Sequence, residues 1–248
     1  MATPQTVAVI PARYASSRFP GKPLALIAGR PMIRRVVEQV RACPAVDEVI
    51  VATDDERIVR AVEAFGGTAV MTRADHATGT DRIAEAVQAS RADLVLNVQG
   101  DEPLMPPEVL TALIQHMRRT GVEMGTAAVP FVRTGRDPSD PNAVKVVVDA
   151  DSRALYFSRS LIPHCRQGGT AVEPLLHWGL YAYRRDFLQR FVAWPRGRLE
   201  GCEMLEQLRA LEHGARIYVL QTEAVSVGVD VPADVALVER LLREQGKA

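Results

Sequence analysis

Cations, hydroxyls and a glycine are concentrated in one short segment near the start of the chain. Residues 12–23 read ARYASSRFPGKP and directly follow a predicted buried strand. In an open α/β sheet, ligands bind beyond the carboxyl ends of the strands, where backbone N–H groups, Arg and Lys can hold phosphates. The segment therefore predicts a triphosphate-binding loop, and the alternative is a solvated basic loop between a strand and a helix. The candidate phosphate ligands are Arg13, Ser16, Ser17, Arg18 and Lys22.

Two common phosphate-binding motifs do not describe this loop. A Walker A loop has Gly six residues before its Lys and Ser or Thr directly after it. Here those positions hold Ser16 and Pro23. The dinucleotide fingerprint G-x-G-x-x-G is absent from the chain. The loop therefore belongs to neither motif class.

Two aspartates that follow predicted strands are the candidate magnesium ligands. Asp101 lies in NVQGDEP, just beyond an apolar run, and Asp230 lies in GVDVP, a similar strand end. Mg²⁺ is usually held by one or two carboxylates together with phosphate oxygens and waters. The alternatives are a turn aspartate for Asp101 and a helix N-cap for Asp230, because Pro232 could begin the next helix. Sequence spacing does not decide whether the two carboxylates meet.

Short apolar runs alternate with helical patterns over the first half of the chain. Uninterrupted apolar runs are typical of strands buried on both faces of a parallel sheet. Pro31 can open a helix with an apolar face, and Thr53 or Asp54 can cap the next helix. This alternation predicts right-handed βαβ units in a doubly wound, mostly parallel, Rossmann-like α/β sheet. The predicted strands are 6–10, 48–52, 68–71 and 94–98, and two further helices are predicted over 80–89 and 107–118.

The middle of the chain has a different pattern. Several strand-like runs follow one another with few helices between them, and residues 149–152 suit a hairpin turn. We therefore expect an inserted antiparallel or mixed β section over about 125–185 that contributes to a subunit contact. Helical patterns return over 200–213 and 232–244, and no repeat or linker divides the chain, so one domain over 1–248 is expected. The strand-like runs are 125–131, 143–148, 154–157 and 175–183.

The overall composition excludes several classes of function. The 30 Lys and Arg residues balance the 30 Asp and Glu residues, so no global field attracts nucleic acid or an anionic membrane. The three cysteines lack C-x-x-C spacing, which argues against a disulfide framework or a zinc site. No apolar run reaches membrane-spanning length and no signal-peptide pattern is present. We therefore expect a cytoplasmic protein without membrane insertion and without a nucleic-acid partner.

Motifs along nearly the whole chain resemble one known family. Their order and register match the 3-deoxy-manno-octulosonate cytidylyltransferases, also called CMP-Kdo synthetases. Three departures are a Thr at position 78 where Ser is common, a shorter loop over 165–175, and Gly201 where His is frequent. The matching segments are VAVIPARYASSRFPGKPL, VATDDERI, MTRADHATGTDR, NVQGDEP, PNAVKVVVD, ALYFSRSLIP, HWGLYAY, EMLEQLRALEHG and GVDVPAD.

The resemblance implies both an activity and a set of site residues. It implies a homodimeric nucleotidyltransferase that moves CMP from CTP to the anomeric hydroxyl of Kdo with Mg²⁺, releasing pyrophosphate, in lipopolysaccharide biosynthesis. The residues it implies for catalysis are Lys22, Asp101 and Arg13, and those for the metal are Asp101 and Asp230. Those for the nucleotide are Arg13, Ser16, Ser17, Arg18, Lys22, Arg73, Thr78, Gly79 and Gln99. Those for the sugar acid are Gln99, Arg159, Arg166, His177, Tyr181 and Glu206.

Structural roles are the alternative for the sugar-site residues. His177 and Tyr181 could share one face of a strand and only pack there. Arg159 could pair with an acidic neighbour, and Glu206 could lie on a solvated helix face. The alternative functions are a cytidylyltransferase for another acidic sugar, such as 8-amino-Kdo or a nonulosonic acid, a uridylyl- or thymidylyltransferase, and a nucleotide-binding regulatory protein.

Overall fold

The computed structural model describes residues 5–15 and 19–246. Ser16, Ser17 and Arg18 of the predicted phosphate loop lie outside the described residues. The chain divides into two compact units, one formed by 1–111 with 226–248 and the other by 112–225. The boundary falls within helix α4 (Pro107–Thr120), and the predicted β section of about 125–185 lies inside the second unit. One domain over 1–248 stays a prediction.

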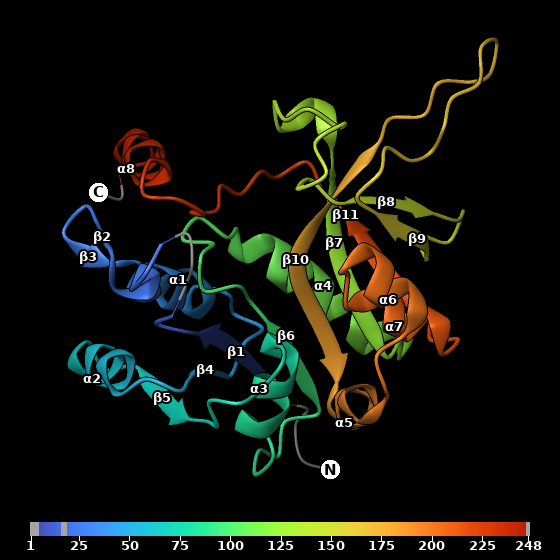
Figure 1. Cartoon of the computed structure of the whole chain (residues 1–248). Coiled ribbons are helices and arrows are strands. Elements are labelled where there is room, and N and C mark those ends of the chain that lie inside the picture. Colours follow the sequence, from blue (N-terminus) through green and yellow to red (C-terminus); the bar gives the residue numbers. More distant parts are fainter. Residues whose placement is uncertain (1–4, 16–18, 247–248) are drawn as a thin grey trace. The chain divides into compact units, whose positions relative to one another are not determined.

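The first unit contains a fully parallel sheet (Figure 1). Its strand order is β6-β1-β4-β5, and each neighbouring pair is parallel. β1 is buried on both faces, since Val7, Ala8, Val9 and Ile10 have no exposed surface. The predicted strands of this half and their parallel arrangement are therefore confirmed, and apolar burial explains why the runs are uninterrupted. The strands are β1 (Thr6–Ala12), β4 (Glu48–Thr53), β5 (Thr68–Met71) and β6 (Leu94–Asn97).

Helices of the first unit pack on this sheet. α1 begins directly after Pro31 and buries the apolar face predicted for it. The cap of α2 is Asp55, not Thr53 or Asp54, because the Asp55 carboxylate accepts a hydrogen bond from Arg57 N over 2.9 Å. The elements are η1 (Lys22–Leu24), β2 (Leu26–Ile27), β3 (Arg30–Pro31), α1 (Met32–Arg41), α2 (Glu56–Ala64), α3 (Gly79–Ala86) and α8 (Asp234–Glu244).

The strands of the second unit pair in a mixed, mostly antiparallel arrangement. β11 is parallel to β7, while β7 with β10, β10 with β8, and β8 with β9 are antiparallel pairs. The predicted antiparallel section is present, but β11 and α5 were not expected from the sequence. The single helix predicted over 200–213 is wrong, because Met204 adopts a left-handed φ of 54° and separates two helices. The elements are β7 (Met124–Pro130), η2 (Phe131–Arg133), β8 (Lys145–Val148), β9 (Ala154–Ser158), β10 (Leu175–Arg184), α5 (Arg185–Ala193), α6 (Arg198–Glu203), α7 (Gln207–Glu212) and β11 (Ile217–Gln221).

In the described part of the chain, no helix combines the length and the apolar character that crossing a bilayer requires.

Candidate active site

Lys22 and Asp101 form an ion pair in the first unit. Lys22 Nζ lies 2.6 Å from Asp101 Oδ2 and donates a second hydrogen bond to the Val229 carbonyl, 3.1 Å away. The Val229 N–H donates in turn to the Asp101 carbonyl over 2.9 Å. This contact joins three segments that sequence analysis singled out separately: the phosphate loop, the QGD segment and the GVD segment.

Two glycines place the members of this ion pair. Gly21 has a φ of 71°, a conformation that glycine adopts at little cost, and the 3-10 helix η1 begins at Lys22 directly after it. Gly100 packs against the end of β1, where an added Cβ would lie 3.0 Å from the Pro11 carbonyl oxygen. The backbone before Asp101 therefore meets the carboxyl end of β1, which is where a parallel α/β sheet binds its ligands.

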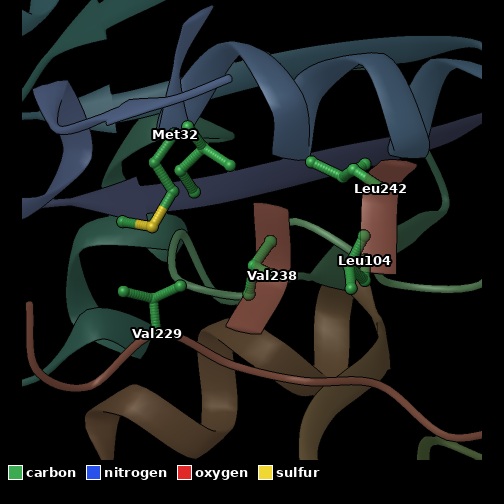
Figure 2. Close-up of a cluster of buried hydrophobic side chains, with 6 residues drawn as sticks. Met32, Leu104, Val229, Val238 and Leu242 are labelled. Carbon is green, nitrogen blue, oxygen red and sulfur yellow. The ribbon is translucent and has the colours of Figure 1, made fainter. Parts of the chain in front are cut away.

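A hydrophobic cluster anchors the Val229 backbone. Val229 is 1% exposed and belongs to a buried cluster with Ile27, Met32, Leu104, Val238 and Leu242. Figure 2 shows Val229 and Met32 side by side, with Val238 from the C-terminal helix beside them. Burying such an aliphatic side chain stabilises a fold by about 1.5–3 kcal/mol. Burial of its side chain thus holds Val229, whose carbonyl accepts a hydrogen bond from Lys22 and which directly precedes Asp230.

Asp230 follows Val229 and is exposed. Its backbone N–H and that of Val231 donate to Asp234 Oδ2 at 2.8 and 2.9 Å. The N-cap alternative for Asp230 is therefore wrong: α8 begins at Asp234, after Ala233, and the Asp234 carboxylate accepts from the N–H groups of this turn. The strand end predicted before Asp230 is also wrong, since the last strand of the described chain, β11, ends at Gln221 and residues 223–230 belong to no strand.

Two aspartates are the candidate metal ligands. Among the described residues, no group of three or more His, Cys, Asp or Glu side chains could hold an ion. Mg²⁺ takes one or two carboxylates and draws its other ligands from phosphates and water. Asp101, whose side chain is 32% exposed, and the exposed Asp230 fit that requirement. Convergence of their side chains on one ion stays a prediction.

The other predicted nucleotide residues of the first unit lie near the ends of its strands. The Arg13 guanidinium donates to the His76 carbonyl over 2.5 Å. Gly79 opens α3, and a Cβ added there would lie 3.6 Å from the Pro11 ring, so this helix N-terminus approaches the end of β1. The Thr78 hydroxyl accepts from Asp81 N over 3.1 Å in a capping box, which gives it a structural role at this helix start.

Arg73 and Gln99 make local contacts. The Arg73 guanidinium donates to both Asp75 carboxylate oxygens, over 2.9 and 2.5 Å. This hydrogen bonding raises the pKa of Arg73 and lowers that of Asp75. Gln99 Nε2 donates to Asn97 Oδ1 over 3.3 Å. The structure therefore brings together Lys22 and Asp101, while Arg73 pairs with its own neighbour on the surface.

His177 lies on β10 beside a bulge in the second unit. The pairing of β10 with β7 shifts between Trp178 and Tyr181, and the Thr126 hydroxyl lies 3.3 and 2.7 Å from the carbonyls of Trp178 and Leu180. His177 Nε2 lies 3.0 Å from the same hydroxyl. A carbonyl can only accept, so the Thr126 hydroxyl donates its single proton to one of the two carbonyls. The hydroxyl therefore accepts from His177, which assigns the imidazole proton to Nε2. The neutral imidazole then keeps an acceptor at Nδ1.

Tyr181 lies on the same face of β10 as His177. Their ring centroids are 5.4 Å apart. The bulge keeps both side chains on one face, because His177 pairs with Ala128 and Tyr181 with Thr126, two positions away on β7. Burial first, and then the charge of Glu206, raise the pKa of Tyr181 well above its usual value. The phenol is therefore protonated at neutral pH and can donate a hydrogen bond. The face shared by His177 and Tyr181 is confirmed, and Glu206 is electrostatically coupled to it.

Arg159 and Arg166 are placed differently. The Arg159 guanidinium donates to the carbonyls of Glu203, Pro141 and Met204 over 2.8, 3.0 and 3.4 Å. The alternative role, pairing of the Arg159 guanidinium with an acidic side chain, is thus replaced by contacts with backbone carbonyls. Arg166 is exposed in the segment 159–174, which Figure 1 shows as a long arm leaving β9 and returning to β10.

Sequence reasoning missed three residues that organise this cluster: Thr126, Lys145 and Glu203. Lys145 has no exposed surface, and its ammonium donates to the carbonyls of Asp140 and Arg159 over 3.0 and 2.5 Å. A lysine inside the apolar run AVKVVV was the available signal, because a buried charge requires dedicated partners. Thr126 and Glu203 carried no comparable signal.

We expect the stability of the protein to depend on the protonation of His177. Burial lowers the pKa of His177 to about 3, from an ordinary value of 6.5. Between these values the unfolded chain binds a proton that the folded chain excludes, so the free energy of unfolding falls as the pH drops below 6.5 and the loss is complete near 3. At about pH 5 the loss amounts to about 2 kcal/mol.

Urea unfolding at neutral pH and at about pH 5 measures this loss. His177→Asn serves as the reference because its side chain does not titrate in this range. The wild type should lose about 2 kcal/mol more than the variant. Equal losses in the two proteins would contradict a half-buried His177 that stays neutral in the folded chain.

A parallel sheet with a Lys–Asp pair near the carboxyl ends of its strands defines an α/β protein with a candidate ligand site at that edge. Residues 7–217 match the model of the cytidylyltransferase family. The 3-deoxy-manno-octulosonate cytidylyltransferase of Syntrophotalea carbinolica is 51% identical over 95% of this chain and 98% of its own length. The enzyme of that name from Myxococcus xanthus is 51% identical over 98% of both chains. This chain therefore belongs to the cytidylyltransferase family and, within it, to the 3-deoxy-manno-octulosonate cytidylyltransferases.

A solved structure agrees with this assignment. The structure of CMP:2-keto-3-deoxy-manno-octonic acid synthetase complexed with CTP has a TM-score of 0.92 and 44% sequence identity to this chain. The match covers 97% of this chain and 99% of that one. The predicted fold class, a mostly parallel α/β sheet with a smaller antiparallel section, is confirmed by this likeness.

Proposed function

We propose that this chain transfers CMP from CTP to the anomeric hydroxyl of Kdo, giving CMP-Kdo and pyrophosphate. The observation that carries the proposal is the contact of Lys22, Asp101 and Val229, found in a chain 51% identical to a 3-deoxy-manno-octulosonate cytidylyltransferase. That contact puts a cation and a carboxylate where an α/β sheet binds phosphates. In the reaction the anomeric oxygen bonds to the α-phosphorus, the bond to pyrophosphate breaks, and the hydroxyl proton passes to water.

Charge repulsion between the two anionic substrates is the first obstacle to this reaction. Two unit charges about 4 Å apart repel by roughly 4 kcal/mol at an effective dielectric of about 20. Lys22 and Arg13 would offset this repulsion by holding the departing phosphates. Ser16, Ser17 and Arg18 belong to the same proposed loop. In the first unit Arg73, Thr78, Gly79 and Gln99 are the remaining residues proposed for the nucleotide.

Mg²⁺ is the proposed cofactor, held by Asp101 and Asp230. The fit rests on two accessible carboxylates and on the hydrogen bond between Val229 N and the Asp101 carbonyl, which ties the segment before Asp230 to Asp101. When bound, the ion would polarise the phosphate and lower the pKa of the attacking hydroxyl. Lys22 would then exchange its contact with Asp101 for a phosphate oxygen, while its contact with the Val229 carbonyl can remain.

The second unit supplies the proposed sugar-acid residues. Arg159 has five N–H groups, of which three donate to carbonyls, so two are left for a carboxylate. His177 Nδ1 can accept from a sugar hydroxyl, and the Tyr181 phenol can donate to one. Glu206 and, from the long arm, Arg166 complete the proposed residues of this unit; Gln99 of the first unit is proposed for the sugar by resemblance alone.

We also propose a cytoplasmic homodimer that serves lipopolysaccharide biosynthesis. Among the described residues β9 itself pairs only with β8, while Tyr218 of β11 bridges to Arg153 just before it, and Leu155 on β9 is 61% exposed. The arm adds the exposed Leu161 and Val172. Large apolar side chains exposed on the surface favour an interaction site. Sedimentation should give twice the 27.1 kDa of one chain, and a single-chain mass would reject the dimer.

Pyrophosphate release tests the proposed function. The purified protein is given CTP with and without Kdo and Mg²⁺, and release should require all three. Replacing CTP by UTP or TTP tests the base, and replacing Kdo by 8-amino-Kdo or a nonulosonic acid tests the sugar. Faster turnover of another triphosphate or another acidic sugar would assign the enzyme to that substrate, and no release in any combination would reject the proposal.

A further inference from the structure

Arg159 is held by an unusual number of directed contacts in the second unit. Its guanidinium donates to carbonyls on both sides, those of Glu203 and Met204 at the end of α6 and that of Pro141 before β8. Its own carbonyl accepts from Lys145 Nζ over 2.5 Å. A long, flexible side chain is therefore fixed before any ligand arrives.

The Glu203 carboxylate fixes the backbone at the same point. Oε1 accepts from the Ser158 hydroxyl over 2.6 Å, and Oε2 accepts from the Arg159 N–H over 2.9 Å. Glu203 is the last residue of α6, the left-handed Met204 follows it, and Glu206 is the N-cap of α7. The carboxylate thus ties the end of β9 to the turn that presents Glu206.

We propose that Glu203 is a positioning residue for the sugar acid, acting through Arg159. The proposal rests on the proposed function and deepens it, because Arg159 is one of the residues proposed to bind the substrate carboxylate. Glu203 and Lys145 hold the backbone of Arg159, and the carbonyls of the turn 203–204 hold its guanidinium. An anion then meets a receptor that is already ordered.

Preorganisation explains why such a device affects binding. Immobilising a rotamer-rich side chain on binding opposes binding through lost conformational entropy, and ordering a backbone segment opposes it more. Contacts that exist before binding remove these costs from the binding step. The contacts of Glu203 are made within the protein, with Ser158 and Arg159, so loss of Glu203 should weaken sugar binding. The nucleotide is proposed to bind in the first unit, and its use should not change.

Glu203→Gln tests the proposal with little change of shape. Glutamine removes the charge: its carbonyl can still accept from Arg159 N–H, but its NH₂ group only donates, so the Ser158 hydroxyl has to turn and accept. Both charge-assisted contacts are thereby replaced by weaker neutral ones. KM for Kdo should rise about tenfold or more, while KM for CTP and kcat stay within about twofold. An unchanged KM for Kdo would overturn the proposal.

Glu212→Gln is the matched control. The Glu212 carboxylate also accepts from backbone N–H groups, those of Arg198 and Leu199 at 2.9 and 3.1 Å, but it does not contact Arg159. It should lower stability and leave KM for Kdo unchanged. An equal rise of KM for Kdo in both variants would assign the effect to general loosening and overturn the proposal.

A double-mutant cycle separates positioning from packing. In an Arg159→Met background, Glu203→Gln should change KM for Kdo little further, because the residue through which Glu203 acts is gone. Additive effects would overturn the proposal.

Hydrogen exchange gives a readout that does not depend on activity. Amides of 157–160 should exchange faster in Glu203→Gln than in the wild type and in Glu212→Gln, and unchanged exchange would overturn the positioning role. An inactive wild type would reject the proposed function alone.

Discussion

Replacing Asp101 with asparagine should reduce kcat about a thousandfold, which corresponds to about 4 kcal/mol of lost transition-state stabilisation. The variant keeps the shape of the side chain but removes the charge that pairs with Lys22 over 2.6 Å. That charge is also the proposed ligand of Mg²⁺, and an amide oxygen is a weaker ligand than a carboxylate. Single-turnover pyrophosphate release, with circular dichroism to verify the fold, measures the effect.

Asp151→Asn is the matched control for this experiment. Asp151 is an exposed aspartate in the turn between β8 and β9, and its carboxylate contacts Arg153 on the surface. This change should leave kcat within about twofold, since surface substitutions have small effects. Near-normal turnover in a folded Asp101→Asn variant would remove Asp101 from the chemistry.

Removing the Lys22 ammonium should have the second-largest effect. We expect Lys22→Ala to lower kcat/KM for CTP about tenfold to a hundredfold, because a charge-assisted hydrogen bond contributes about 1.5–3 kcal/mol. KM for Kdo should stay within about threefold, since Lys22 is proposed to hold phosphates of the nucleotide. Steady-state kinetics with each substrate varied in turn gives both values.

A second cation of the same unit controls for lost positive charge. Arg41 lies at the end of α1 and donates to the Gly66 carbonyl on the surface. Arg41→Ala should leave both Michaelis constants unchanged. If Lys22→Ala keeps both constants and kcat as well, Lys22 does not hold the triphosphate.

The parallel half of the fold was predictable because burial on both faces leaves a clear pattern. Val7 to Ile10 form an apolar run that only a two-sided core explains. The helix break at Met204 was not predictable in this way, because the 200–213 pattern remains amphipathic across it. A left-handed methionine is held there by tertiary contacts of Glu203 and Arg159, and no local propensity favours it.

The candidate site shows a similar division. Gly21, Lys22 and Asp101 could be found from the sequence, since glycine and charge stand directly beyond buried strands. Their contact with Val229 could not be found, because it joins residues more than a hundred positions apart through a backbone carbonyl. Arg159 was found only by resemblance, and its binding to carbonyls depends on two turns that the sequence does not specify.

The most direct test of the proposed chemistry is a crystal structure of the protein with CTP and Mn²⁺, which replaces Mg²⁺ and scatters anomalously. The proposed mechanism predicts an anomalous peak bound by the carboxylates of both Asp101 and Asp230 and by a phosphate oxygen, with Lys22 moved from Asp101 to the nucleotide. A peak held by phosphates alone, with Asp230 directed elsewhere and Lys22 still paired with Asp101, would contradict it.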